Sequence, residues 1–341
     1  MLELTELDTL PAGLLDLPSA QVLHTLMPKP TLLHLQGRRE PRLFVSILLH
    51  GNEDTGFYAS QQLLRKYQQQ TLPRSLSIFF GNIEAARFGK RRLEGQPDYN
   101  RVWPGTDMAA CTETRLMEQV TQSVLAKGVF ANVDVHNNTG KNPHYGCINT
   151  LDNRALHLAR LFANIAVFFE TPHGLQSMAF APYCPAITIE CGKPGVAQGV
   201  EHVREYLDAL LHLHEIPSHS LPIHDLSIYK TVAQVTLPEE YTFSFSDPAA
   251  DIQLLPTLDC YNFSELPAGT VFGATRTPSA RLLAWDETNQ EVGEHFFTCT
   301  NAQIQLKLSL MPAMLTLDET IIRQDCLCYL MKRLPVENAV T

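Results

Sequence analysis

Short apolar runs alternate with amphipathic stretches along roughly the first 215 residues of the chain. The apolar runs have the length of buried strands, and the amphipathic stretches repeat their apolar positions at the period of a helix. This alternation predicts an α/β fold with a mixed, mostly parallel sheet flanked by helices. The expected inner strands are 43–49, 76–80, 132–135, 165–169 and 186–189. The expected helices are 56–69, 112–126, 154–164 and 199–212. A turn-like segment at 37–41 lies between apolar runs at 31–36 and 42–49, which predicts a hairpin.

The pattern changes near residue 216, where a segment rich in proline, serine and histidine (216–222) has the composition of a linker. Beyond it come short strand-like segments separated by turn residues. Between 304 and 310, apolar and polar residues alternate strictly, as in a strand with one buried face. The expected strands are 231–237, 242–246, 270–275, 281–285, 296–300 and 304–310. We therefore predict an α/β domain over 1–215 and a smaller, mainly β C-terminal domain over 218–341.

Charge and composition limit the classes of binding partner that the protein can have. The net charge of −10 disfavours a nucleic-acid partner, which would select a basic surface. It is compatible with a small anionic substrate, because a few arginines can dominate a cleft. No apolar run approaches the ~20 residues that span a bilayer, and the acidic N-terminus lacks a targeting signal. The eight cysteines show no metal-binding spacing. These features predict a cytoplasmic protein with reduced thiols.

Polar residues stand directly after four of the apolar runs. His50 and Glu53 follow the run that ends at position 49, and Asn82 follows the run that ends at position 80. His136 ends the third run and Glu190 ends the fourth. Parallel strands bring their carboxyl ends to one edge of a sheet, where open α/β folds bind ligands. We expect these four groups to lie together at that edge.

The side chains at this edge suit metal-assisted hydrolysis. His50, Glu53 and His136 form the His₂Glu ligand set of catalytic zinc sites. Glu190 has no evident structural need there, and its carboxylate suits a general base. Each residue also has a structural explanation: a turn histidine with a helix-start carboxylate, a core histidine, or a salt-bridge partner. The occurrence of all of them at one edge favours the metal site. Asp134 could orient His136 or satisfy the local backbone, and both possibilities stay open.

Basic residues lie between the first and third of these positions, in Gly89-Lys90-Arg91-Arg92 and Asp98-Tyr99-Asn100-Arg101. Such groups can polarise a substrate carbonyl and hold a carboxylate through a bidentate fork. A solvated, charged surface is the alternative for this cluster. The combination indicates hydrolysis of an amide in an anionic substrate.

In the order of these motifs, the chain resembles the succinylglutamate desuccinylase/aspartoacylase family, which has the zinc carboxypeptidase fold. The resemblance covers roughly residues 40–215. The matching pieces are His50-Gly51-Asn52-Glu53, Gly81-Asn82, Gly89-Lys90-Arg91, Asp98-Tyr99-Asn100-Arg101, Asp134-Val135-His136 and Ile189-Glu190-Cys191-Gly192.

The resemblance implies a role for each matching side chain. His50, Glu53 and His136 would bind Zn²⁺, and Glu190 would activate water. Arg91 would stabilise the oxyanion, whereas Asn100 and Arg101 would hold the substrate carboxylate. It also implies a C-terminal β domain that partly covers the active site.

Three segments depart from the family pattern. After His136 the chain reads Asn137-Asn138-Thr139-Gly140, where desuccinylases of the family have Thr-Ala-Ile-Arg or similar. Segment 180–185 lacks the arginine that aspartoacylases carry before the catalytic glutamate, and 83–84 lacks prolines. One of the two asparagines is a candidate to face the substrate. His144 and Tyr145 either contact substrate or belong to an exposed loop. The catalytic residues thus match the family, whereas the specificity elements differ.

The sequence therefore predicts a zinc-dependent hydrolase that cleaves the amide bond of an N-acyl amino acid or a similar small carboxylate. One alternative is a zinc carboxypeptidase acting on peptides, and another is a catalytically inactive, ligand-binding relative. No nucleic-acid or membrane partner is expected. The acyl group, the amino acid and the oligomeric state stay open.

Overall fold

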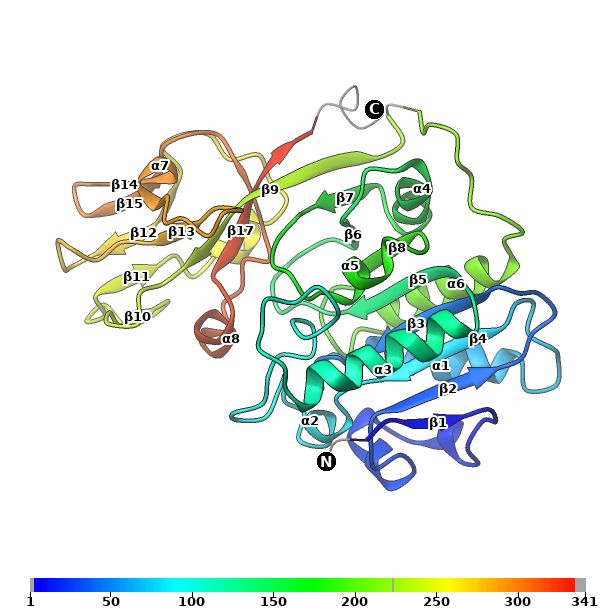
Figure 1. Cartoon of the computed structure of the whole chain (residues 1–341). Coiled ribbons are helices and arrows are strands. Elements are labelled where there is room, and N and C mark those ends of the chain that lie inside the picture. Colours follow the sequence, from blue (N-terminus) through cyan, green and yellow to red (C-terminus); the bar gives the residue numbers. More distant parts are fainter. Residues whose placement is uncertain (1–2, 223, 335–341) are drawn as a thin grey trace. The chain divides into compact units, whose positions relative to one another are not determined.

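The structure is a computed structural model that describes residues 3–222 and 224–334. Within these ranges the chain forms two compact units (Figure 1). The first contains residues 3–137 and 144–227, and the second contains residues 138–143 and 228–334. The chain therefore enters the second unit directly after Asn137 and returns to the first at His144. No helix in the described part of the chain is long and apolar enough to cross a membrane.

A mixed sheet forms the centre of the first unit. Its strand order is β1-β2-β4-β3-β5-β8-β6-β7. Only two neighbouring pairs among these described strands, β2–β4 and β6–β8, are antiparallel. The strands are β1 (Thr5–Leu7), β2 (Thr31–Leu35), β3 (Arg42–Ile47), β4 (Leu76–Phe80), β5 (Val129–His136), β6 (Tyr145–Ile148), β7 (Ile165–Phe168) and β8 (Ala186–Glu190). The predicted α/β class with a mostly parallel sheet is confirmed.

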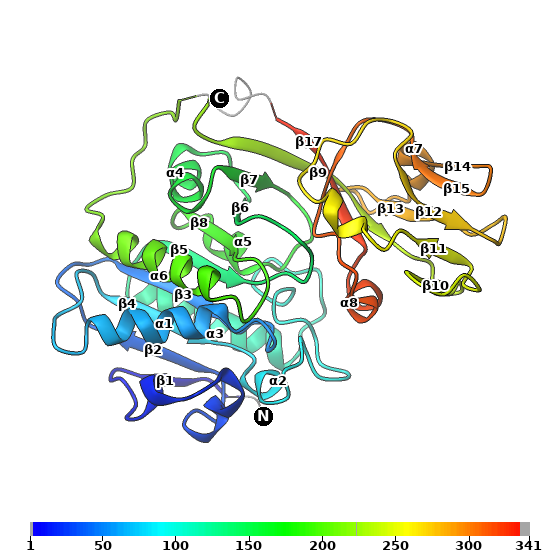
Figure 2. The ribbon, with the colours of Figure 1, turned by 180° about the vertical axis from the view of Figure 1, so that it is seen from behind.

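Helices cover both faces of this sheet. Figure 1 shows α3 in front of the strands, and the reverse view in Figure 2 shows α1 and α6 on the opposite face. The α-helices are α1 (Thr55–Lys66), α2 (Ile83–Arg87), α3 (Thr112–Ala126), α4 (Asn153–Phe162), α5 (Gln176–Phe180) and α6 (Ala197–His212). Short 3₁₀ helices occupy Leu14–Asp16 and Ala20–Thr25. The apolar side of α3, including Leu116 and Val120, packs with Phe44 and Phe79 from the sheet. Sheet and helix thus bury matching apolar faces, as their sequence periods predict.

The predicted hairpin between 31–36 and 42–49 is wrong. Strands β2 and β3 do form, but β4 lies between them and pairs with both. It is antiparallel to β2 and parallel to β3, with Leu76 opposite Leu35 on one side and Leu43 on the other. All three strands are buried. In this order β4 is hydrogen-bonded to a strand on each side, and β3 lies inside the sheet between β4 and β5.

The second unit is mainly β, as the composition after residue 216 predicts. Strands β10-β11-β12-β15-β14 form a separate sheet in that order, while β9 pairs with β13 and β17, and β17 pairs with β16. The strands are β9 (Ser227–Thr236), β10 (Phe243–Ser244), β11 (Ile252–Leu254), β12 (Val271–Thr275), β13 (Leu283–Trp285), β14 (Phe297–Thr300), β15 (Gln303–Leu306), β16 (Met311–Ala313) and β17 (Cys328–Arg333). The helices are a 3₁₀ turn (Leu258–Tyr261), α7 (Gly293–Phe296) and α8 (Glu319–Gln324).

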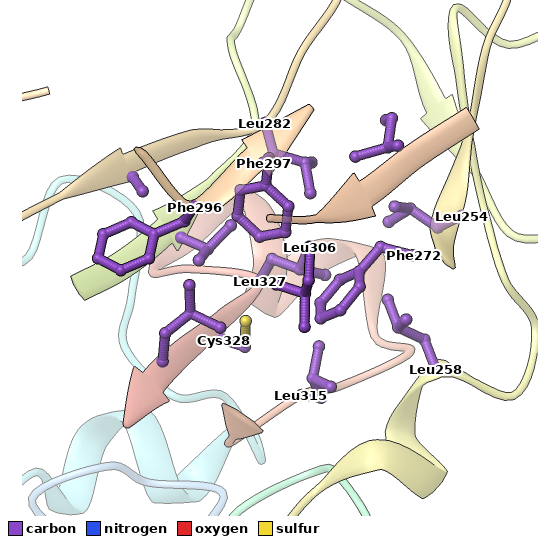
Figure 3. Close-up of a cluster of buried hydrophobic side chains, with 14 of the residues drawn as sticks. Leu254, Leu258, Phe272, Leu282, Phe296, Phe297, Leu306, Leu315, Leu327 and Cys328 are labelled. Atoms are coloured by element: carbon purple, nitrogen blue, oxygen red, sulfur yellow. The ribbon is translucent and has the colours of Figure 1, made fainter. Parts of the chain in front are cut away.

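An apolar core fills the second unit (Figure 3). Phe272 is fully buried in it, with its ring 5.3 Å from that of Phe297 and 5.9 Å from that of Tyr261. The predicted strand 304–310 is shorter than expected, since β15 ends at Leu306. Leu310 is still buried, but its backbone forms an isolated bridge with Leu266. The alternation of apolar and polar residues over 304–310 therefore predicts burial correctly. The backbone pairing changes along this segment, from β12 and β14 at its start to Leu266 at Leu310.

Candidate metal centre

The turn after β3 brings His50 and Glu53 together. The backbone N–H of Glu53 donates to the carbonyl of His50 at 3.1 Å, which closes the turn. Gly51 packs so closely on α2 that an added Cβ would collide with the backbone of Ala86. Only glycine fits at this close approach. Both functional side chains therefore point inward just before α1 begins.

His50, Glu53 and His136 meet at one buried point. Their ligand atoms all lie within 4.8 Å of one another. The Glu53 carboxylate is 2.8 Å from Nδ1 of His50 through one oxygen and 2.8 Å from Nδ1 of His136 through the other. The two Nδ1 atoms are 3.2 Å apart. The structure thus brings the three predicted ligands together around a space that suits one cation.

Each ligand histidine has a carboxylate behind it. Nε2 of His50 lies 2.9 Å from Oδ1 of Asp98, and Nε2 of His136 lies 2.8 Å from Oδ2 of Asp134. Asp134 also accepts a hydrogen bond from Ser46 at 2.6 Å. A carboxylate on Nε2 keeps the proton there and leaves the Nδ1 lone pair for a metal. The donor set therefore fits Zn²⁺, and Asp134 orients His136, which was one of its two predicted roles.

Buried charges dominate the electrostatics of this group. Burial would raise the pKa of Glu53, but the adjacent histidines lower it well below its usual range. Burial would also lower the pKa of His136, but Asp134 and Glu53 raise it well above normal. Burial and Arg91 oppose charge on His50, while Asp98 and Glu53 outweigh them and raise its pKa. The carboxylates thus favour positive charge at this point, whether it comes from protons or from a metal.

Glu190 ends β8 directly beside the last ligand. It pairs in register with His136 of β5, on a parallel ladder, and with Tyr145 of β6 on its other side. Paired residues on neighbouring strands present their side chains to the same face of a sheet. Glu190 is also buried. The predicted base and the predicted ligand therefore share one face at the carboxyl edge.

The basic residues lie close to this edge. One guanidinium nitrogen of Arg91 is 3.5 Å from the Glu53 carboxylate, and another donates to Asp98 at 3.1 Å. Arg101 donates to the backbone carbonyl of Asn100 at 2.8 Å. The amide nitrogen of Asn100 lies 3.3 Å from Nε2 of His136. Arg91 thus touches the ligand group directly, whereas Asn100 packs behind a ligand histidine.

Asn82, the remaining polar residue at a strand end, caps α2. Its side-chain oxygen accepts from the N–H of Ala85 at 3.1 Å, and its amide donates to Gln96 at 2.8 Å. A side-chain cap of this kind satisfies a backbone donor at the start of a helix. Asn82 therefore supports the loop that carries Arg91.

The loop after His136, which departs from the family pattern, belongs to the second unit from residue 138 to residue 143. The hydroxyls of Thr139 and Thr316 are 2.6 Å apart, and Asn142 accepts from the N–H of Met314 at 3.0 Å. An added Cβ at Gly140 would collide with the carbonyl of Leu315. These residues anchor the loop within the second unit.

His144 and Tyr145, the other two candidates in this region, lie back in the first unit. Tyr145 begins β6 and is fully buried, and the ring of His144 stacks on that of His202 at 4.7 Å. The described contacts of His144 are therefore with aromatic rings of the scaffold.

Sequence reasoning missed two residues of this site. Asp98 lies in the Asp98-Tyr99-Asn100-Arg101 motif, where the sequence predicts no role for it, although it contacts His50 and Arg91. The sequence predicts Asn137 only as a candidate to face the substrate, whereas its backbone N–H donates to the Glu53 carboxylate at 3.0 Å. The sequence signals that could have indicated these roles are the position of Asp98 near the basic cluster and the position of Asn137 directly after the ligand His136.

A family model described as the succinylglutamate desuccinylase/aspartoacylase catalytic domain matches residues 39–211, just over half of the chain. The chain belongs to this family. The matched region contains His50, Glu53 and His136, so the predicted resemblance is confirmed. The protein is therefore a hydrolase of the desuccinylase/aspartoacylase family with a His-Glu-His metal-binding group.

Several solved structures share the fold. The succinylglutamate desuccinylase from Chromobacterium violaceum is 18% identical, with a TM-score of 0.53 over 80% of this chain and 86% of that chain. Murine aminoacylase 3 is 16% identical, with a TM-score of 0.58 over 87% of this chain and 97% of that chain. The succinylglutamate desuccinylase/aspartoacylase from Rhodobacter sphaeroides is 14% identical, with a TM-score of 0.57 over 88% of each chain. At such identities the likeness concerns the fold. None of the curated proteins matches this sequence.

Proposed function

We propose that the protein is a zinc-dependent hydrolase that cleaves the amide bond of an N-acyl amino acid or a similar small carboxylate. The observation that carries this proposal is the convergence of His50, Glu53 and His136, with Glu190 in register beside His136. The names of two structurally similar proteins, a succinylglutamate desuccinylase and an aminoacylase, favour an N-acyl amino acid.

The residues at this edge divide the chemistry between them. Zn²⁺ held by the His₂Glu set would supply a Lewis acid that acidifies water and polarises the amide carbonyl. Glu190 takes the proton from the attacking water and returns it to the nitrogen of the leaving amine. Asp98 and Asp134 keep the two imidazoles oriented by accepting from their Nε2–H groups.

The arginines complete the proposed site. Arg91 donates to the oxyanion of the tetrahedral intermediate, a role supported by its position 3.5 Å from the Glu53 carboxylate. Arg101 holds the substrate carboxylate, and for Asn100 to share this role its side chain must exchange its partners at His136 and Gln176. The guanidinium of Arg101 donates to the Asn100 carbonyl, so binding requires it to share or exchange that partner. The substrate is therefore a small anion.

A substrate panel tests the proposal. Zinc-loaded protein is incubated with N-succinyl, N-acetyl and longer N-acyl amino acids and, in parallel, with short unblocked peptides. We expect release of the free amino acid from at least one N-acyl compound and little cleavage of the peptides. Cleavage of peptides alone would instead identify a carboxypeptidase. Turnover of neither class by the zinc-loaded protein would contradict a hydrolytic function.

A further inference from the structure

Asn137, the residue directly after the ligand His136, is buried and makes hydrogen bonds in three directions. Its backbone N–H donates to the Glu53 carboxylate at 3.0 Å. Its side-chain oxygen accepts from the N–H of Thr55 at 3.2 Å, while its amide nitrogen donates to the Thr55 hydroxyl at 2.9 Å. The same nitrogen donates to the carbonyl of Gly192 at 2.8 Å. The amide group therefore uses both its donor and its acceptor atoms.

These bonds connect three segments that are far apart in the sequence. Thr55 is the first residue of α1, directly after the turn that carries His50 and Glu53. Gly192 lies two residues after Glu190, in the turn that follows β8. A second bond reaches the same turn, because the N–H of Cys191 donates to the carbonyl of His136 at 2.9 Å. Asn137 thus ties the turn behind Glu190 to the start of α1.

We propose that Asn137 is a positioning residue that fixes the direction of the Glu190 carboxylate relative to the metal ligands. Glu190 is the last residue of its strand, and the backbone leaves the ladder just beyond it, after the bond from Cys191 to the carbonyl of His136. On the other side its backbone continues into the turn that Asn137 holds through Gly192. A base displaced by about 1 Å can lose a factor of about 10² in rate. The inference deepens the proposed function and rests on the assignment of Glu190 as the base.

The side chain of Asn137 can be tested apart from its backbone. In Asn137→Ala the N–H bond to Glu53 remains, but the bonds to Thr55 and Gly192 are lost. Asn137→Asp keeps the Thr55 bonds, because a carboxylate accepts from both the N–H and the hydroxyl, but it places an oxygen against the Gly192 carbonyl. Thr55→Val is the matched control, since it removes only the hydroxyl and leaves the bond to Gly192.

We expect Asn137→Ala and Asn137→Asp to lower kcat by about 10- to 100-fold, with KM changed by less than about 3-fold. Thr55→Val should keep kcat within about 3-fold of wild type. The zinc affinity of Asn137→Ala should be unchanged within about 3-fold, because the backbone bond to the ligand carboxylate remains. A side chain that merely supports the fold would not produce this separation of kcat from KM and zinc binding.

Amide hydrogen exchange gives a readout that needs no substrate. The peptide covering residues 190–196 is followed by mass spectrometry in metal-free and zinc-loaded protein. Its exchange should be about 10-fold faster in Asn137→Ala than in wild type, and unchanged in Thr55→Val. Equal exchange and equal kcat in Asn137→Ala and wild type would overturn the proposal. A fall in zinc affinity as large as the fall in kcat would also overturn it, because the residue would then serve the metal. If wild-type protein hydrolyses no substrate, the proposed function fails, while exchange still decides whether Asn137 holds the turn.

Discussion

The edge that carries the metal ligands and the core of the second unit bury opposite kinds of side chain. At the carboxyl edge of the first sheet, two histidines and several carboxylates are buried together, among them Glu53 and Glu190. The core of the second unit is made of aliphatic and aromatic side chains (Figure 3). Burying apolar area stabilises a fold, whereas burying charge costs stability unless every charge is paired. The stability of the fold therefore does not account for the buried charges at this edge. Metal binding and catalysis account for them.

The pairing at the charged edge is specific. Each ligand histidine lies between the Glu53 carboxylate and an aspartate. Removing one partner leaves a buried charge uncompensated, while removing an apolar core side chain leaves a cavity. The comparison therefore predicts that isosteric substitutions at the charged edge change function, whereas truncations in the apolar core change stability.

The largest effect is expected at the base. Glu190→Gln keeps the shape of the side chain but cannot take a proton, so kcat should fall by about 10²- to 10⁴-fold. Zinc content and thermal unfolding should stay at their wild-type values. Steady-state kinetics and metal analysis measure both, with Glu239→Gln, an exposed glutamate of the second unit, as the control. An active Glu190→Gln variant would show that another group is the base.

The second unit should show the reverse behaviour. Phe272→Ala removes a fully buried ring from the apolar core and should lower the free energy of unfolding by about 3–5 kcal/mol. Zinc affinity should not change, because Phe272 belongs to the apolar core of the second unit, whereas the ligands belong to the first unit. Denaturant unfolding and zinc titration measure the two quantities. Phe272→Leu retains most of the apolar volume and should cost clearly less. A Phe272→Ala variant of wild-type stability would remove the contrast between the regions.

An intermediate effect is expected for the carboxylate behind His50. Asp98→Asn weakens the acceptor for Nε2–H of His50 and removes the charge that pairs with Arg91. Zinc affinity should fall by about 10- to 100-fold, as for other residues behind metal ligands. Competition with a chelator of known affinity measures the change. The control is Asp107→Asn, whose side chain is 83% exposed. Unchanged affinity in Asp98→Asn would mean that His50 is oriented without it.

The smallest effect concerns His34, a buried polar residue of β2 whose ring nitrogen lies 2.8 Å from the Ser77 hydroxyl. Burial, with Lys127 and Arg42, lowers its pKa against the opposing effect of Glu6. A lowered folded pKa contributes stability that is complete above the unfolded value, about 6.5, and is lost as pH falls through the folded pKa.

In wild type, the free energy of unfolding should fall as the pH is lowered from about 7 to about 5. In His34→Gln this fall should be smaller, by less than about 1.4 kcal/mol per pH unit. Denaturant unfolding at several pH values provides the measurement. His214→Gln, at an exposed position, serves as the control. A steeper pH dependence in His34→Gln than in wild type would reverse the assigned direction.

Local patterns in the sequence predict most of the first unit. The runs that end before His50 and at Glu190 form β3 and β8, and the helical period predicts α1, α3, α4 and α6. The ligands were predictable because parallel strands carry their ends to one edge. Strand pairing was less predictable, since β4 separates β2 from β3 through contacts that no local pattern specifies. Strand β6 was missed because its four residues follow a loop and include a glycine.

The supporting residues of the site show the same limit. His50 and His136 have side chains suited to a metal, so their type indicates their role. Asp98 and Asn137 act through partners 48 and 55 residues away in the sequence, His50 and Gly192. Their functions depend on the tertiary structure that brings these partners within hydrogen-bond distance.

The most direct measurement is hydrolysis of an N-acyl amino acid by protein whose metal has been removed with a chelator, before and after zinc is returned. Because His50, Glu53 and His136 form a single ligand group, we expect no turnover without metal and full recovery at about one zinc per chain. Equal turnover with and without zinc, or failure of the protein to take up zinc, would contradict a metal-dependent hydrolase.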